Sequence, residues 1–124
     1  MLENTMSEFQ NKLKKLMHSY VKCAYEVTKK FPKEELYSSV SQLRRSSMSV
    51  ILNFVEGYGR RRDKVKLNFY EMSYGSLNES KYIFYFALDE NWIEHKDYKK
   101  ALDLGEEIGA MLWSEIKSVE KNIN

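Results

Sequence analysis

Five basic side chains lie within seven residues near the middle of the chain, and these side chains are the best suited to binding a charged ligand. They are Arg60, Arg61, Arg62, Lys64 and Lys66. Arginine offers a planar fork of N–H donors that matches phosphate oxygens, and lysine adds a compact positive charge. Because the start of a helix also presents free backbone amides, the cluster predicts a phosphate-binding turn. The alternative is a solvated turn whose arginines pair with acidic residues of another helix or subunit.

The residue patterns that catalysis would need are missing. A di-metal site in a helical bundle uses Glu-x-x-His on two helices, yet neither His18 nor His95 follows a glutamate by three positions. No zinc or P-loop motif is present, and the Gly-Tyr-Gly at 57–59 lacks the third glycine of a dinucleotide site. Cys23 has no partner cysteine in the chain. We therefore expect a non-enzymatic protein with no catalytic residues, metal or cofactor, although a serine and histidine pair stays open.

The charge is small overall but unevenly distributed. The 124 residues carry a formal net charge of +2, and 43% of them are hydrophobic, which predicts one ordered domain. Residues 40–70 contain seven basic and two acidic side chains, a balance of +5, whereas residues 89–124 contain five basic and nine acidic side chains, a balance of −4. The opening residues lack the apolar run of a signal peptide, and no stretch has the ~20 apolar residues of a membrane span. We expect a cytoplasmic protein without a membrane partner.

Apolar residues recur at intervals of three and four throughout the chain, and alternation with a period of two is absent. The pattern predicts helices over about residues 7–30, 34–57, 64–88 and 98–121 of a single domain spanning 1–124. Either Thr5 with Glu8 or Ser7 with Gln10 suits a capping box for the first helix. Asp63 and Asp97 are expected N-caps of the third and fourth helices. Short connections then specify an all-α, antiparallel up-down-up-down four-helix bundle.

The second and third predicted helices each carry two neighbouring apolar stripes. A bundle helix buries about one stripe, so the second stripe predicts self-association into a homo-oligomer. The aromatic residues that suit such an interface are Tyr58, Tyr70, Tyr74 and Phe84. A wide core face in an obliquely packed bundle is the alternative. In a closed ring, each subunit would repeat the basic cluster and so build a continuous positive field.

Several ordered motifs resemble the four-helix bundle proteins encoded in the intervening sequences of bacterial 23S ribosomal RNA genes, often labelled S23 ribosomal proteins. They are FPKEELY at 31–37, SQLRRS at 41–46, NFVEGYGR at 53–60, Phe69, and GSLNE at 75–79. The resemblance implies a bundle that assembles as a ring-shaped homopentamer with a role in nucleic-acid binding. More distantly, the chain is similar to the accessory proteins of diversity-generating retroelements, which work with a reverse transcriptase. Ile51 stands where the family commonly has proline, so any bend there should be weaker.

The residues shared with the family also have structural interpretations. Arg44 and Arg45 fall in the middle of the second helix, and we expect ion pairs that link Arg44 to Glu56 or Glu79 within or between subunits. Gly75, beside Ser76, should allow close helix approach. On this interpretation, Arg44→Ala weakens assembly.

Two functions follow from these observations. The favoured hypothesis is an oligomeric bundle that binds the backbone of RNA or DNA through the basic cluster. The alternative is a protein-interaction or scaffold module, such as an accessory subunit of a reverse transcriptase, that does not itself bind nucleic acid. A hidden hydrolase or metal enzyme is the third hypothesis, and elemental analysis of the purified protein tests its metal form.

Overall fold

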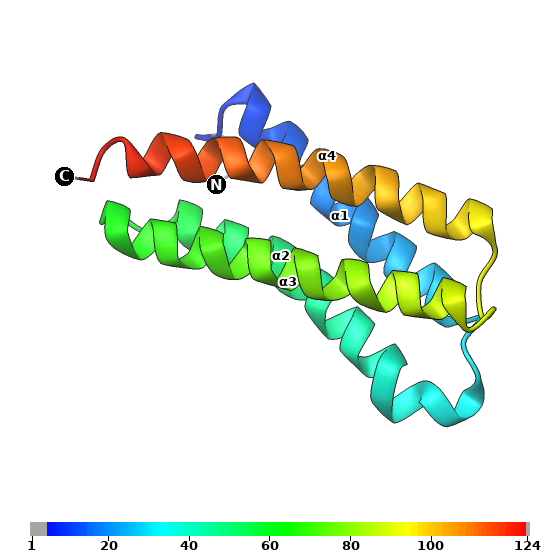
Figure 1. The fold of residues 1–124 in the computed structure, drawn as a ribbon. Coiled ribbons are helices and arrows are strands. Elements are labelled where there is room, and N and C mark those ends of the chain that lie inside the picture. The colour runs from blue at the N-terminus through cyan, green and yellow to red at the C-terminus, as the bar shows by residue number, and fades with distance from the viewer. Residues whose placement is uncertain (1–4, 124) are drawn as a thin grey trace.

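Four long helices and one short irregular segment make up the computed structural model, which describes residues 5–123. In chain order these are α1 (Glu8–Thr28), the 3₁₀ turn η2 (Lys33–Glu35), the π-helical turn η3 (Leu36–Val40), α2 (Ser41–Tyr58), α3 (Asp63–Asp89) and α4 (His95–Glu120). No strand occurs within residues 5–123, which confirms the predicted all-α class. Figure 1 shows the α2–α3 turn beside the end of α4, with the α3–α4 turn at the opposite end of the molecule.

The core forms where the helices pack against one another, α1 with α2 and α4, and α3 with α2 and α4. Large side chains from all four helices are buried there, among them Leu13, Tyr20, Phe54, Leu77 and Leu112. The buried serines of α3 are paired: the hydroxyls of Tyr20 and Ser80 lie 2.7 Å apart, and Ser73 donates to the backbone carbonyl of Val50 at 2.6 Å. Each pairing removes the penalty of burying an unsatisfied hydroxyl, so the serines of α3 fit inside an otherwise apolar core.

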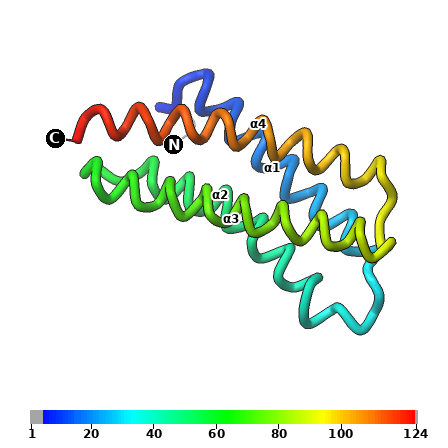
Figure 2. Tube along the Cα trace, in the orientation of Figure 1, coloured from blue at the N-terminus to red at the C-terminus, as the bar shows by residue number. Residues whose placement is uncertain are grey.

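The segment before α2 differs from the continuous helix predicted from residue 34. It begins with the 3₁₀ turn η2 and the π-helical turn η3, and the cyan trace in Figure 2 swings away from the other helices there. The Glu35 carboxylate accepts hydrogen bonds from Ser38 at 2.9 Å and Ser39 at 2.5 Å. A π turn holds an extra residue and shifts the helical phase. Leu36 is therefore 49% exposed, and Tyr37 beside it is 91% exposed.

The structure confirms one of the predicted helix caps and differs from two others. Ser7 caps α1, and the predicted capping box with Gln10 is present. The α4 helix starts earlier than predicted because Glu94 is its cap residue, and Asp97 is the third helical residue that completes the box. Asp63 is the first residue of α3 rather than its cap, so its charge lies near the positive end of the helix dipole.

Close helix approach occurs at Gly57 and not at Gly75, where the sequence suggested it. A Cβ added at Gly57 would lie 2.9 Å from the Cβ of Phe69 and 2.9 Å from ring carbons of Tyr70. A Cβ added at Gly75 would meet nothing within 4 Å. Gly57 is therefore the glycine that lets α2 pack directly on α3 at the basic end of the bundle.

One ion pair joins the end of the α1 segment to the start of α4. The Nζ of Lys30 lies 2.8 Å from Oδ2 of Asp97, and that carboxylate also accepts a bond from the backbone N–H of Glu94. Burial acts to raise the pKa of Asp97, but the hydrogen bonds from Lys30 and Glu94 outweigh it and hold the pKa below its usual range. The same contact raises the pKa of Lys30.

We expect Asp97→Asn to lower the melting temperature near neutral pH but not in acid. A carboxylate whose pKa is lowered by folding stabilises the protein above its unfolded pKa and loses that effect as the pH falls through the folded value. Below that value the wild-type side chain is neutral and resembles asparagine. Melting curves at about pH 7 and about pH 2 should show a gap between the two proteins only at the higher pH. A gap of equal size at both pH values would contradict this assignment.

Candidate nucleic-acid interface

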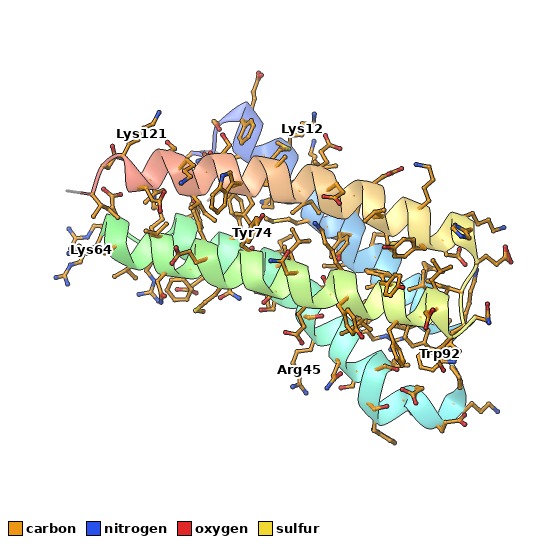
Figure 3. The ribbon with its side chains drawn as sticks, in the orientation of Figure 1. Lys12, Arg45, Lys64, Tyr74, Trp92 and Lys121 are labelled. Atoms are coloured by element: carbon orange, nitrogen blue, oxygen red, sulfur yellow. The ribbon has the colours of Figure 1, made fainter. Side chains whose placement is uncertain are left out.

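The predicted basic cluster lies where α2 ends and α3 begins, and we call Arg60, Arg61, Arg62, Lys64 and Lys66 the basic turn. The first four side chains are exposed and Lys66 is half-buried. Arg60, Arg61, Arg62 and Val65 line a shallow hollow of about 270 Å³. Figure 3 shows Lys64 at the tip of the bundle, with Lys121, which follows α4, near the same end. The sequence therefore places its densest positive charge at one end of the molecule.

Two cations of the basic turn contact neighbouring side chains of α2 and α3. Arg60 donates to Glu56 at 2.6 Å, and its guanidinium lies 5.0 Å from the ring centroid of Phe69. The Nζ of Lys66 lies 5.5 Å from the ring centroid of Tyr58. These contacts orient both cations without burying them, so each still attracts an anion. Exposed pairs of this kind contribute little to stability.

The other three cations have no such neighbours. Arg61, Arg62 and Lys64 form no ion pair with any acidic residue among residues 5–123. An arginine fork without an acidic partner keeps all its donors for a ligand. Among residues 5–123, none of these three side chains is therefore paired with an acidic residue of another helix, which was the alternative interpretation of the turn.

Arg44 does not make the ion pair expected of it within the subunit. Its Nε donates to Oγ1 of Thr28 at 2.9 Å, and its guanidinium lies 4.6 Å from the ring centroid of Tyr25. Glu56 pairs with Arg60 instead, and Glu79 is exposed on α3. Arg44 therefore ties α2 to α1 through a hydroxyl and a ring, because those groups, and not a carboxylate, face it.

Arg44 and its neighbour Arg45 also border a groove. Arg44 and the exposed Arg45 line a hollow of about 760 Å³ on the outer side of α2, together with apolar side chains that include Leu36, Tyr37 and Leu52. Arg45 points away from the rest of the bundle in Figure 3. The structure thus assigns Arg45 to a surface that is mostly apolar and separate from the basic turn.

The tyrosines proposed for self-association occupy different environments. Tyr70 is 1% exposed and stacks on Phe54 at 5.3 Å between ring centroids, and Phe84 is also 1% exposed. Both rings therefore belong to the core of the subunit, since they face α2 and α1 and not solvent. Burial raises the pKa of Tyr70, whose hydroxyl has no hydrogen-bond partner in the described part of the chain. Tyr58 is half-buried and donates to Thr5 at 2.9 Å.

Tyr74 instead faces a residue that the sequence analysis did not single out. Its ring centroid lies 5.5 Å from that of Trp113 on α4, and Trp113 is 47% exposed. A signal was available, because Trp113 lies between the buried Leu112 and Ile116 and so falls off the apolar stripe of α4. A tryptophan off the buried stripe of an amphipathic helix is a surface aromatic.

A metal-ligand cluster and a membrane-spanning helix each place requirements on the described part of the chain. Residues 5–123 contain no group of three or more histidine, cysteine or carboxylate side chains placed to hold a metal ion. None of their helices is both long and apolar enough to cross a membrane. Cys23 is buried, and burial raises the pKa of its thiol, which leaves it a weak nucleophile.

Comparisons with known proteins agree with this fold. The sequence profile described as "23S rRNA-intervening sequence protein" matches residues 10–114. A crystal structure from Bacteroides thetaiotaomicron VPI-5482, a protein of unknown function from the S23 ribosomal protein family, superimposes with a TM-score of 0.78. The match covers 85% of this chain and 98% of that one at 19% identity, so it bears on fold alone. Among curated proteins, none matches the chain in sequence.

Proposed function

Because the chain belongs to the 23S rRNA-intervening sequence protein family, we propose that it is a non-enzymatic bundle that self-associates and binds the backbone of RNA or DNA. The observation that carries this proposal is the set of exposed cations Arg61, Arg62 and Lys64 at one end of the bundle, which have no ion-pair partner among residues 5–123. Phosphate contacts by lysine and arginine supply most of the affinity of proteins that bind nucleic acid without reading its sequence. The overall charge of +2 limits binding elsewhere on the surface.

Self-association is supported by two exposed apolar surfaces outside the core. The first comprises Leu36, Tyr37 and Leu52, which are 49%, 91% and 60% exposed, with Arg45 beside them. The second lies on α3 and comprises Tyr82, Tyr85 and Phe86, which are 64%, 50% and 38% exposed. The sequence neighbours of this second surface include the acidic Glu79, Asp89 and Glu90. A basic apolar surface and an acidic apolar surface suit a head-to-tail contact between copies.

Head-to-tail contacts generate closed rings when the rotation between copies closes. We propose that antiparallel up-down-up-down bundles assemble in this way into a ring-shaped homopentamer. Each copy would add its own basic turn, so a small cluster would become a ring of positive charge. This arrangement reconciles a nearly neutral chain with a polyanionic ligand.

The experiment that tests the proposal is a salt titration of binding, with light scattering on the same samples. Labelled RNA and DNA should bind at low salt, and the logarithm of the association constant should fall linearly with the logarithm of salt concentration. Each phosphate contact contributes about 0.7 to 0.9 to that slope. Scattering should give the mass of a multiple of the subunit. Absence of binding at low salt, or binding insensitive to salt, would eliminate this function.

A scaffold function is the second candidate, and the apolar groove on α2 favours it. A hollow of about 760 Å³ with Tyr37 and Leu52 on its walls could hold part of a protein partner, such as a reverse transcriptase. On this view the purified protein carries no nucleic acid, which the ratio of absorbance at 260 and 280 nm reports. Partner capture would also survive removal of Arg60, Arg61 and Arg62.

A further inference from the structure

An aromatic pair formed by the half-buried Tyr74 and the exposed Trp113 joins α3 to α4. Trp113 is 47% exposed, and its ring is tilted by 48° against that of Tyr74 at 5.5 Å. The Nζ of Lys117 lies 4.8 Å from the centroid of the Trp113 ring. The backbone at Gly75, next to Tyr74, borders open space. The Lys117 side chain is 54% exposed, so both the Trp113 ring and this cation are accessible to a ligand.

We propose that Tyr74, Trp113 and Lys117 form a base-stacking subsite for single-stranded nucleic acid whose backbone is held by the basic turn. This inference rests on the proposed function and names the strand type that the protein prefers. An aromatic face next to a cation matches the composition of sites that bind single strands, where bases stack on rings and phosphates meet positive charge. A base inside a duplex already has both faces covered by its neighbours, so a protein ring stacks on it only after it leaves the helix.

The position of the pair relative to the basic turn fits one continuous strand. Lys64 and Tyr74 are ten positions apart on α3. At the helical rise of about 1.5 Å this is about 15 Å, or roughly four nucleotides at the stacked spacing of about 3.4 Å. Lys117 on α4 and Lys121, the C-cap residue of that helix, follow Trp113 at four-residue intervals and so share its side of the helix. In Figure 3, Tyr74 lies between α3 and α4, and Lys64 and Lys121 mark the end toward which the strand would run.

The carboxylates of Glu120 and Glu71 lie close to this path and oppose the binding of a negatively charged strand. Glu120 contacts Nζ of Lys117 at 3.2 Å, but the two side chains are 42% and 54% exposed, so the pair is weak and a phosphate can replace the carboxylate. Glu71 is exposed on α3 one turn before Tyr74. Its removal should strengthen binding, because it is the acidic group between the basic turn and the aromatic pair on that helix.

The test uses two single-tryptophan proteins, since the chain has only Trp92 and Trp113. Trp92→Phe leaves Trp113 as the reporter, and Trp113→Phe leaves Trp92, which packs against Phe31 and Phe86 at centroid distances of 5.0 and 5.6 Å. Oligouridylate and oligothymidylate of about 12 nucleotides, a length within known site sizes, serve as probes. A duplex of equal length is the competitor. Stacking predicts quenching of Trp113 fluorescence by the single strands, and none of Trp92.

Affinity measurements complete the test. Trp113→Ala should weaken single-strand binding about fivefold or more, because stacking on one ring is worth at least that factor. Trp113→Phe should retain most of the affinity. Duplex binding should be the same in the wild type, Trp113→Ala and Trp113→Phe. Preference for RNA over DNA, if present, appears between the two single-stranded probes and leaves the subsite intact.

Other outcomes overturn the subsite in distinguishable ways. If Trp113→Ala binds single strands as the wild type does, or binds single strands and duplex with equal losses, the backbone function stands and the subsite is wrong. If Trp113→Ala dissociates the oligomer and leaves binding per subunit unchanged, the ring is a contact between copies. If neither probe binds at low salt, the proposed function fails together with the subsite.

Discussion

Gly57→Ala should lower the free energy of unfolding by about 1 to 3 kcal/mol, the usual cost of overpacking a buried site. The new methyl group would meet the Cβ of Phe69 and the ring of Tyr70, each at 2.9 Å. Neither atom can move freely, because the Cβ is fixed to the α3 backbone and the Tyr70 ring is stacked on Phe54. The higher helix propensity of alanine, about 1 kcal/mol, offsets only part of this cost. Urea unfolding monitored by circular dichroism measures the change.

Gly75→Ala is the matched control, since the same substitution is made in an open part of a helix. Its methyl group would meet nothing within 4 Å, so only the propensity term acts. We expect the free energy of unfolding to rise by about 0.5 to 1 kcal/mol. Two changes of the same sign would show that α2 and α3 are not packed this closely at Gly57.

The all-α class could be predicted from the sequence because periodicity of three and four residues reports directly on a buried helix face. The face that the residues before α2 turn toward the core could not be predicted. It depends on a π turn in which the Glu35 carboxylate accepts hydrogen bonds from Ser38 and Ser39. That local arrangement turns Leu36 and Tyr37 outward. A prediction from periodicity assumes one regular helix. One extra residue in a turn therefore assigns every residue before that turn to the wrong face of the helix.

The position of the basic turn followed from composition alone, but the pairing of its cations did not. Charge and spacing indicate that Arg60 and Glu56 can meet at four-residue separation, yet they cannot say that Arg44 faces Thr28. Contacts between helices depend on rotation and height, which short motifs leave undefined. The same reason explains why Tyr70 suited an interface in sequence and lies in the core in the structure.

Replacing Arg60, Arg61 and Arg62 together by alanine should abolish nucleic-acid binding at physiological salt. Each lost phosphate contact lowers the slope of the salt dependence by about 0.7 to 0.9, so the slope should fall by about 2 to 3. The remaining cations of the turn, Lys64 and Lys66, are too few to hold a backbone when salt competes. All three arginines are exposed, so the melting temperature should change little. Fluorescence anisotropy of labelled RNA over a range of salt concentrations measures both affinity and slope.

The control separates the position of the charge from its amount. Lys96, Lys99 and Lys100 are exposed in the first turns of α4, so their triple alanine variant changes the net charge equally. It removes charge at the end of the bundle opposite the basic turn, where the acidic residues of the C-terminal segment predominate. If binding depends on a local cation cluster, this variant keeps the affinity and slope of the wild type to within about twofold, as expected for screened charges beyond ~10 Å. Equal losses in the two variants would mean that the ligand responds to the overall charge of the protein. The basic turn would then be a solvated loop, and the exposed groove on α2 would be the stronger guide to function.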